Sequence, residues 1–267
     1  MGVKSIIQKF EIEGQVLSAK PFGSGHINDT FHIENADSKY PDYLLQRVNH
    51  EVFKDVPGMM DNIWQVTEHI NKKNIVSVDA TYSQETLEEQ AYEGARAFGL
   101  FFNLLSDFPT DRLIDTIPHF HNIILRLQTL KQVVEKFPNG RTKQVEKDIK
   151  FVFNLSEQMC QVENLKLKGE IPIRVTHNDT KFNNYDFGDG IRTGTTTAAE
   201  DETDLSLVQF DINKYEAFTA GYLDVTRAIL SPIEVEFIGL SGALFAYIMG
   251  VRFLTDYISN DVYYKIG

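Results

Sequence analysis

Residues 171–184, IPIRVTHNDTKFNN, run from apolar and β-branched residues into a polar loop. The loop contains His177, Asp179 and Asn184 in the spacing H-x-D-x-x-x-x-N. In this spacing the carboxylate can accept the proton of a hydroxyl group, and the amide can turn back to hold a metal ion on a phosphate chain. The alternative is a polar loop whose Asp and Asn side chains only cap turns. The segment therefore predicts either a phosphoryl-transfer loop after a strand or a capped turn.

A glycine-containing turn and a cation lie upstream of this loop. The turn PFGSGHINDTF separates two strand-like runs, and its tip consists of Gly23, Ser24, Gly25 and His26. Glycines let backbone amides approach phosphate oxygens, although a short G-S-G between strands is more often only a hairpin turn. Arg47, in the next run DYLLQRVN, is a candidate for holding the α- and β-phosphates of a nucleotide. Its alternative is a surface charge on a strand.

The whole chain divides into a small β-rich part and a larger helical part. Alternating apolar residues over 15–49 predict three strands, and IPIRVTH predicts another strand. Helical spacing predicts helices over residues 57–74, 84–105, 117–136, 142–165 and 233–259. We therefore predict an α+β, protein-kinase-like fold with two lobes. A nucleotide-binding lobe with a small antiparallel sheet covers residues 1–82, and a mostly helical lobe with the catalytic loop and acceptor pocket covers residues 83–267.

Composition and charge narrow the function classes. Among 267 residues, 42% are apolar and the net charge is −12, so the chain is expected to fold and to be repelled by nucleic acid and anionic membranes. The single cysteine, Cys160, excludes an internal disulfide. The most apolar segment, Phe237 to Met249, is expected to be too short and too interrupted to span a bilayer. These features predict a soluble, cytoplasmic protein.

Several longer strings resemble the aminoglycoside phosphotransferase and choline kinase superfamily, and within it the N-acetylhexosamine 1-kinases. They are GSGHINDTF, LLQRVNHEVFKDVPGMMDNI, RVTHNDTKFNN, YDFGDGIRTGTTTAAEDE and GVRFLTDYISNDVYYKI, which together cover most of the chain. The resemblance implies that Asp179 is the catalytic base, that Asn184 binds Mg²⁺ and that the loop from Gly23 to His26 lies over the phosphates of ATP. It also implies an amino sugar as acceptor, phosphorylated at its anomeric hydroxyl.

The chain departs from this family at two places. Relatives carry a hairpin after the catalytic-loop Asn that ends in an Asp ligand for a second metal ion, whereas Asn184 is followed at once by Tyr185 and DFGD. Asp186 is a candidate for that ligand, but a structural or substrate-side carboxylate is the preferred interpretation. Near Asn74 and Ile75 there is no room for further sheet strands, so one face of the sheet should be poorly covered. We hypothesise omitted segments at about 74/75 and 184/185; a continuous chain would instead favour an inactive relative.

Candidates for acceptor binding lie in the helical part. Arg252 stands among apolar residues, where a guanidinium needs partners, and either sugar hydroxyls or an ion pair with Asp256 would supply them. Asp189 is a second candidate, although it can equally pair with Arg192. His119, in PHFHN, is a third, with a helix-capping or core role as its alternative. Choline, an aminoglycoside or homoserine remain alternative acceptors, and a non-catalytic pseudokinase remains the alternative to an enzyme.

Overall fold

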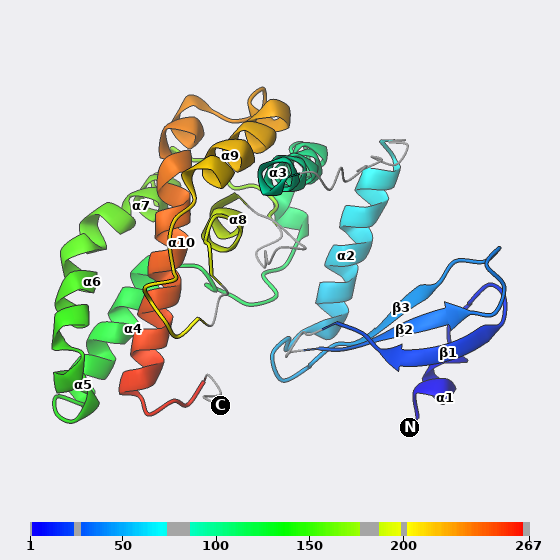
Figure 1. The fold of residues 1–267 in the computed structure, drawn as a ribbon, viewed down its shortest axis with the longest axis horizontal. Helices are drawn as coiled ribbons and strands as arrows, with labels where there is room; N and C mark the ends of the chain where they lie inside the picture. The colour runs from blue at the N-terminus through cyan, green and yellow to red at the C-terminus, as the bar shows by residue number, and fades with distance from the viewer. Residues whose placement is uncertain (1, 24–27, 74–85, 177–186, 199–201, 264–267) are drawn as a thin grey trace. The chain divides into compact units, whose positions relative to one another are not determined.

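The protein belongs to the α+β class, with one small antiparallel sheet and a mostly helical remainder (Figure 1). The structure is a computed structural model, and it describes residues 2–23, 28–73, 86–176, 187–198 and 202–263. By their internal contacts these residues form two units. The smaller unit contains residues 1–65 and 113–118, and the larger unit contains residues 66–112 and 119–267. The predicted lobe boundary at 82/83 lies outside the described residues.

The smaller unit contains the three predicted strands. They are β1 (Val16–Pro21), β2 (Asp29–Asn35) and β3 (Tyr43–Arg47), in the order β1-β2-β3 with both pairs antiparallel. Ile33, in the central strand, is buried, as the alternation of apolar and polar residues requires. A short helix, α1 (Val3–Ile7), precedes the sheet and was not predicted. The β-hairpin pattern of the sequence is therefore confirmed.

Apolar side chains of the sheet and of the following helix are poorly covered. Helix α2 (Val56–Asn71) matches the predicted helix, and none of its residues, all of which the structure describes, is buried. Leu17 and Leu44 in the sheet are 64% and 63% exposed, and Trp64 in α2 is 60% exposed. The two faces of a three-stranded sheet are buried only where other strands or helices pack against them. The poorly covered sheet expected from the sequence is therefore observed, while the proposed omission near 74/75 lies outside the described residues.

The first core of the larger unit is formed by three helices. They are α3 (Leu87–Leu104), α8 (Phe187–Gly194) and α9 (Ile212–Thr226). Their buried side chains include Ala95, Phe187 and Phe218. A Cβ atom added at Gly221 would lie 2.1 Å from the backbone oxygen of Tyr92, so α3 and α9 meet backbone to backbone at this point. A glycine is required there because any other residue would force the helices apart.

The second core is built around the long helix α10 (Pro232–Ile258). Helix α10 runs alongside α4 in Figure 1 and also packs against α6 and α8. The other helices are α4 (Ile123–Lys136), α5 (Arg141–Gln144), α6 (Glu146–Met159) and α7 (Gln161–Leu167), with a 3₁₀ turn, η1 (Thr110–Arg112), before them. Leu130 and Val251 are fully buried in this core.

Side-chain caps explain where several helices begin. Thr86 and Glu89 form a capping box before α3, and Ser231 and Glu234 form another before α10, where Pro232 occupies the first turn. Helix α4 begins at Ile123, later than the predicted 117, because the Asn122 side chain accepts a hydrogen bond from the Leu125 amide at 3.0 Å. The predicted helices over 84–105 and 233–259 are confirmed within the usual uncertainty of helix ends.

Two predicted elements are wrong. The helix over 142–165 is divided into α5, α6 and α7, with breaks at Val145 (φ −109°, ψ 23°) and Cys160 (φ −83°, ψ −4°). The strand predicted for IPIRVTH is absent over its described part, residues 171–176. A strand needs a neighbouring strand for its backbone hydrogen bonds, and the described sheet consists of β1, β2 and β3 alone.

Helix α10 is longer than the apolar segment from Phe237 to Met249 suggested. It has 27 residues, and its most apolar window has a mean hydropathy of 1.7. Among the described helices it is the one that is long and apolar enough to cross a membrane, a test that core helices of soluble proteins also pass. Its buried side chains pack against α4 and α6, and 28% of that window is buried inside the protein. The absence of a membrane contact stays a prediction.

Candidate functional site

The predicted site residues fall into two groups. Those outside the described residues are Ser24, Gly25, His26, Asp179, Asn184 and Asp186. Those that the structure describes are Gly23, Arg47, His119, Asp189 and Arg252. The proposed junctions at 74/75 and 184/185 also lie outside the described residues. The structure therefore bears on the segments that flank the predicted loop in sequence and on the described acceptor candidates.

Gly23 begins the turn between β1 and β2. Its φ angle is +80°, in the left-handed region that favours glycine, and among the described atoms none lies within 4 Å of an added Cβ. The amide of Phe22 donates a hydrogen bond to the Thr30 carbonyl at 2.9 Å, which extends the hairpin beyond the strand. The glycine at this position is thus explained by backbone conformation alone, and its exposed backbone leaves the phosphate-binding hypothesis open.

Arg47 lies at the end of β3, directly opposite Asp29 in β2. The two side chains form an ion pair with Nε of Arg47 at 2.8 Å from Oδ2 of Asp29, and Arg47 is 75% exposed. Asp61, on the following helix α2, accepts a hydrogen bond from Gln65 at 2.6 Å. An exposed pair of this kind contributes only about 0.2–1 kcal/mol, so it would not prevent Arg47 from binding an anionic ligand.

Asp189 and Arg192 pair with each other on α8. The distance from Arg192 Nη2 to Asp189 Oδ1 is 2.9 Å, and both side chains are largely buried. The mutual pairing considered as an alternative is therefore present. It sets the direction of the Asp189 carboxylate, because one of its oxygens faces the guanidinium along the helix.

The PHFHN turn and Arg252 lie together. Arg252, on α10, has its guanidinium carbon 4.7 Å from the ring centre of Phe120 and 5.9 Å from that of Tyr263. It also donates to the sulfur of Met249 at 3.3 Å. His119 is exposed at the start of the turn with a φ angle of +60°, and its carbonyl accepts a hydrogen bond from the Asn122 amide. Two acceptor candidates that are far apart in sequence are thus linked through Phe120.

Asp256, the other predicted partner of Arg252, is buried near the end of α10. Its Oδ1 atom accepts a hydrogen bond from the backbone amide of Tyr263 at 2.7 Å. This bond ties the segment after α10 back onto the helix. Asp256 therefore has a structural task that the i, i+4 spacing from Arg252 did not indicate.

The sequence did not single out Arg174 or Glu234, yet they form a well-connected pair, and Arg174 lies three residues before the predicted loop in the sequence. Arg174 Nε lies 2.7 Å from Glu234 Oε1, and Nη2 lies 2.9 Å from Oε2. Burial alone would raise the pKa of Glu234, but hydrogen bonds from Arg174 and Ser231 outweigh it and hold the pKa below its usual value. The hydrogen bond to Glu234 raises the pKa of Arg174. The capping sequence SPIE was the one visible signal for Glu234.

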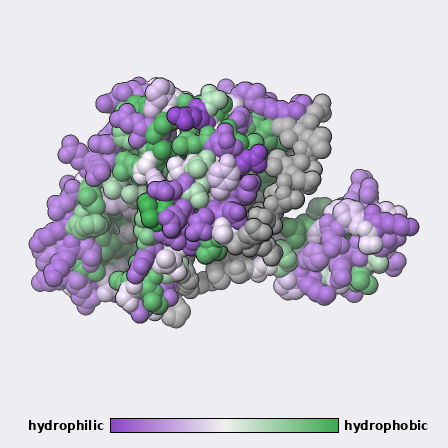
Figure 2. Space-filling model, turned by 45° about the horizontal axis from the view of Figure 1, so that its top comes forward, coloured by the Kyte–Doolittle hydropathy of each residue, from purple (hydrophilic) through white to green (hydrophobic). Residues whose placement is uncertain are grey.

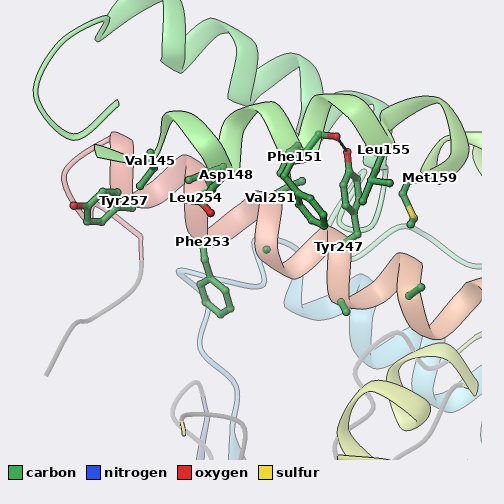
Figure 3. Close-up of a pocket in the computed structure, with 14 residues that line it drawn as sticks. Val145, Asp148, Phe151, Leu155, Met159, Tyr247, Val251, Phe253, Leu254 and Tyr257 are labelled. Atoms are coloured by element: carbon green, nitrogen blue, oxygen red, sulfur yellow. Dashed lines mark hydrogen bonds between the residues drawn. The ribbon is translucent and has the colours of Figure 1, made fainter. Parts of the chain in front are cut away.

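A large apolar groove lies between α6 and α10 and has a volume of about 710 Å³ (Figure 3). Phe151, Phe253 and Tyr257 form part of its walls, and Asp148 is the one charged residue among the described residues that line it. The Tyr247 hydroxyl donates to the Val152 carbonyl at 2.7 Å, as the dashed line in Figure 3 shows. None of the described site candidates lines this groove. Its chemistry suits apolar contacts and lacks the cations that phosphates need.

The surface carries both polar and apolar side chains. In the view of Figure 2, hydrophobic side chains are interleaved with a mainly hydrophilic surface.

Among the described residues there is no cluster of three or more His, Cys, Asp or Glu side chains that could hold a metal ion. The predicted Mg²⁺ ligand Asn184 and the candidate Asp186 lie outside these residues, so the metal prediction stays a prediction.

In comparison with known proteins, the chain matches no family model. The resemblance to sugar kinases therefore stays an expectation from the quoted strings.

Proposed function

We propose that the protein is an ATP-dependent small-molecule kinase with a two-lobed, protein-kinase-like fold. The observation that carries the proposal is the H-x-D-x-x-x-x-N string over residues 177–184, within the longer run RVTHNDTKFNN. The confirmed antiparallel hairpins, the left-handed Gly23 between β1 and β2, and helix α2 after β3 support it, because kinase-like chains carry these elements in this order before the catalytic loop.

The proposed roles follow from the chemistry of each side chain. Asp179 orients the acceptor hydroxyl and accepts its proton, while Arg47 and the backbone from Gly23 to His26 hold the phosphates of ATP. Asn184 is the proposed ligand of Mg²⁺, which would neutralise charge on the phosphates. Catalysis by such a site rests on positioning and on electrostatic stabilisation of the transferred phosphoryl group.

The proposed acceptor is an N-acetylhexosamine, phosphorylated at its anomeric hydroxyl to give the sugar 1-phosphate. Arg252, Asp189 and His119 are the proposed acceptor-binding residues. The position of Arg252 against Phe120 supports a polar and aromatic surface, since sugars bind through hydroxyl hydrogen bonds and through contacts with aromatic faces. A cationic acceptor such as choline would instead favour several carboxylates or open aromatic faces.

The proposal is tested by phosphorus NMR of the protein with Mg-ATP and one acceptor at a time. The acceptors are N-acetylglucosamine, N-acetylgalactosamine, galactose, choline and an aminoglycoside. We expect a new anomeric phosphate signal with the two acetylated amino sugars and with neither galactose nor the cationic compounds. Transfer to choline or to the aminoglycoside would move the acceptor to another class, and the absence of any transfer would contradict the kinase proposal.

A non-catalytic pseudokinase is the second candidate, favoured by the direct succession of Asn184 and Tyr185. The exposed apolar side chains of α2 and the sheet support an omitted segment as the explanation of the departure near residue 74. Sequencing the full-length transcript distinguishes the two. A hairpin ending in Asp after residue 184 would favour the enzyme, and its absence together with ATP binding and no transfer would favour the pseudokinase.

We expect Arg252→Ala to raise the KM for the acceptor about tenfold and to leave the KM for ATP unchanged, since a hydrogen bond from a charged group is worth about 1.5–3 kcal/mol. Steady-state kinetics with each substrate varied in turn checks this. Arg112→Ala is the matched control, because Arg112 also stacks on a ring, that of Phe108 at 5.7 Å, and has no proposed role. An unchanged acceptor KM with a lower melting temperature would assign Arg252 a purely structural role.

A further inference from the structure

Arg174 connects residues 171–176, which precede the predicted catalytic loop, to three other parts of the larger unit. Its guanidinium bonds both carboxylate oxygens of Glu234, and Nη2 also donates to the backbone carbonyl of Ile229 at 2.7 Å. The guanidinium carbon lies 5.6 Å from the ring centre of Phe102. The side chain is thus held by the first turn of α10, by the segment after α9 and by α3.

Glu234 is itself fixed from the other side. Its carboxylate accepts hydrogen bonds from the Ser231 amide and hydroxyl, both at 2.8 Å, as part of the capping box of α10. The side chains of Arg174 and Glu234 are only 18% and 12% exposed. A bidentate Arg–carboxylate pair with this many partners has one geometry, because the planar guanidinium fork fits the two oxygens in a single plane.

Such a pair is better suited to setting geometry than to adding stability. Desolvation of two buried charges offsets most of their attraction, so replacing both residues by apolar ones is often as stable, whereas removing one partner leaves the other charge buried and lowers the melting temperature. Ser231 and Pro232 can begin α10 without Arg174, since both belong to the helix start itself. What the apolar replacement would lose is the fixed direction of the chain at Arg174, three residues before His177 and five before Asp179.

We propose that Arg174, held by Glu234, is a positioning residue for phosphoryl transfer. The pair fixes the chain at Arg174, five residues before the proposed base Asp179, and its loss is expected to lower the rate of phosphoryl transfer. This inference rests on the proposed function. Small displacements of a reacting group of about 1 Å can lower turnover about 100-fold, which makes kcat the sensitive quantity.

The experiment compares Arg174→Met, Arg174→Lys and Glu234→Gln with the unaltered protein. For each we measure kcat, the KM for ATP, the KM for the acceptor and the melting temperature, with kinetics recorded well below the lowest melting temperature. We expect Arg174→Met to lower kcat about 10- to 100-fold with both KM values within about twofold. We expect Arg174→Lys to recover most of the melting temperature and little of kcat, since an ammonium keeps the charge and lacks the planar fork.

Arg141→Met is the matched control at the other end of α10. Arg141 also pairs with a carboxylate, that of Asp261, donates to a backbone carbonyl, that of Tyr257, and stacks on the Tyr257 ring at 4.6 Å. Glu234 and Tyr257 are 23 positions apart on α10, or about 35 Å along the helix. We expect Arg141→Met to lower the melting temperature with kcat within about twofold.

The outcomes separate this inference from the proposed function. An unaltered protein that transfers phosphate to no acceptor would overturn both. An active protein whose Arg174→Met variant keeps kcat and loses only melting temperature would overturn the positioning role alone, as would an equal fall of kcat in Arg141→Met. If Arg174→Met does not fold, Glu234→Gln carries the same expectation for kcat, because glutamine keeps the size of the side chain and an oxygen for Ser231.

Discussion

The Asp179→Asn variant is expected to lose about 100- to 10,000-fold in kcat, the range that general acid–base groups contribute. The amide keeps the size of the carboxylate but cannot accept the proton of the acceptor hydroxyl. ATP affinity should stay within about twofold, because the carboxylate acts on the acceptor and not on the nucleotide. Steady-state kinetics and a nucleotide-binding titration on the same preparation check both parts.

Asp148→Asn is the matched control for this substitution. It makes the same chemical change at an exposed carboxylate of α6 in the larger unit, and we expect no change in kcat. Near-normal turnover of Asp179→Asn would contradict the assignment of the catalytic base. A large loss of ATP affinity would indicate that Asp179 acts on the nucleotide and not on the acceptor.

Gly221→Ala is expected to destabilise the larger unit by about 3 kcal/mol, at the upper end of the range for overpacking. The added Cβ would lie 2.1 Å from the Tyr92 oxygen, 2.8 Å from its carbonyl carbon and 3.0 Å from its Cα. All three are backbone atoms of α3, so no side chain can rotate to make room, and α9 must move away. Thermal or urea unfolding of the purified variant measures the loss.

Gly250→Ala is the control, because the same substitution has the opposite expected sign there. Gly250 lies inside α10, and no described atom lies within 4 Å of an added Cβ. Alanine should therefore stabilise the helix by about 0.8–1 kcal/mol through its higher propensity. Equal stability of Gly221→Ala and the unaltered protein would contradict the close approach of α3 and α9.

Sequence patterns predicted those elements whose signals are local. The alternation over residues 15–49 predicted three strands, which the structure contains as β1, β2 and β3, and the capping sequences at Thr86 and Ser231 lie where α3 and α10 begin. Both signals depend on neighbours within a few positions of the chain, since strand alternation and helix caps are short-range properties. The left-handed conformation of Gly23 is likewise a local property, because glycine favours it at a turn.

Long-range partners were not predictable in this way. Arg47 pairs across the sheet with Asp29, a partner that the sequence pattern did not indicate. The division of residues 142–165 into three helices has no Gly or Pro to announce it, and the run 171–176 found a side-chain partner in Glu234 instead of a neighbouring strand. Each of these outcomes depends on which distant residue the fold brings near.

By itself the sequence determined the α+β class, the three strands of the small antiparallel sheet and the kinase-like string over residues 177–184, because these follow from periodicity and from spacing along the chain. Only the tertiary structure decided that Arg174 meets Glu234, that Arg252 lies against Phe120 and that α3 and α9 touch at Gly221. The reason is physical: buried charges and close backbone contacts are satisfied by whichever partner packing supplies, and packing joins residues that no local pattern relates.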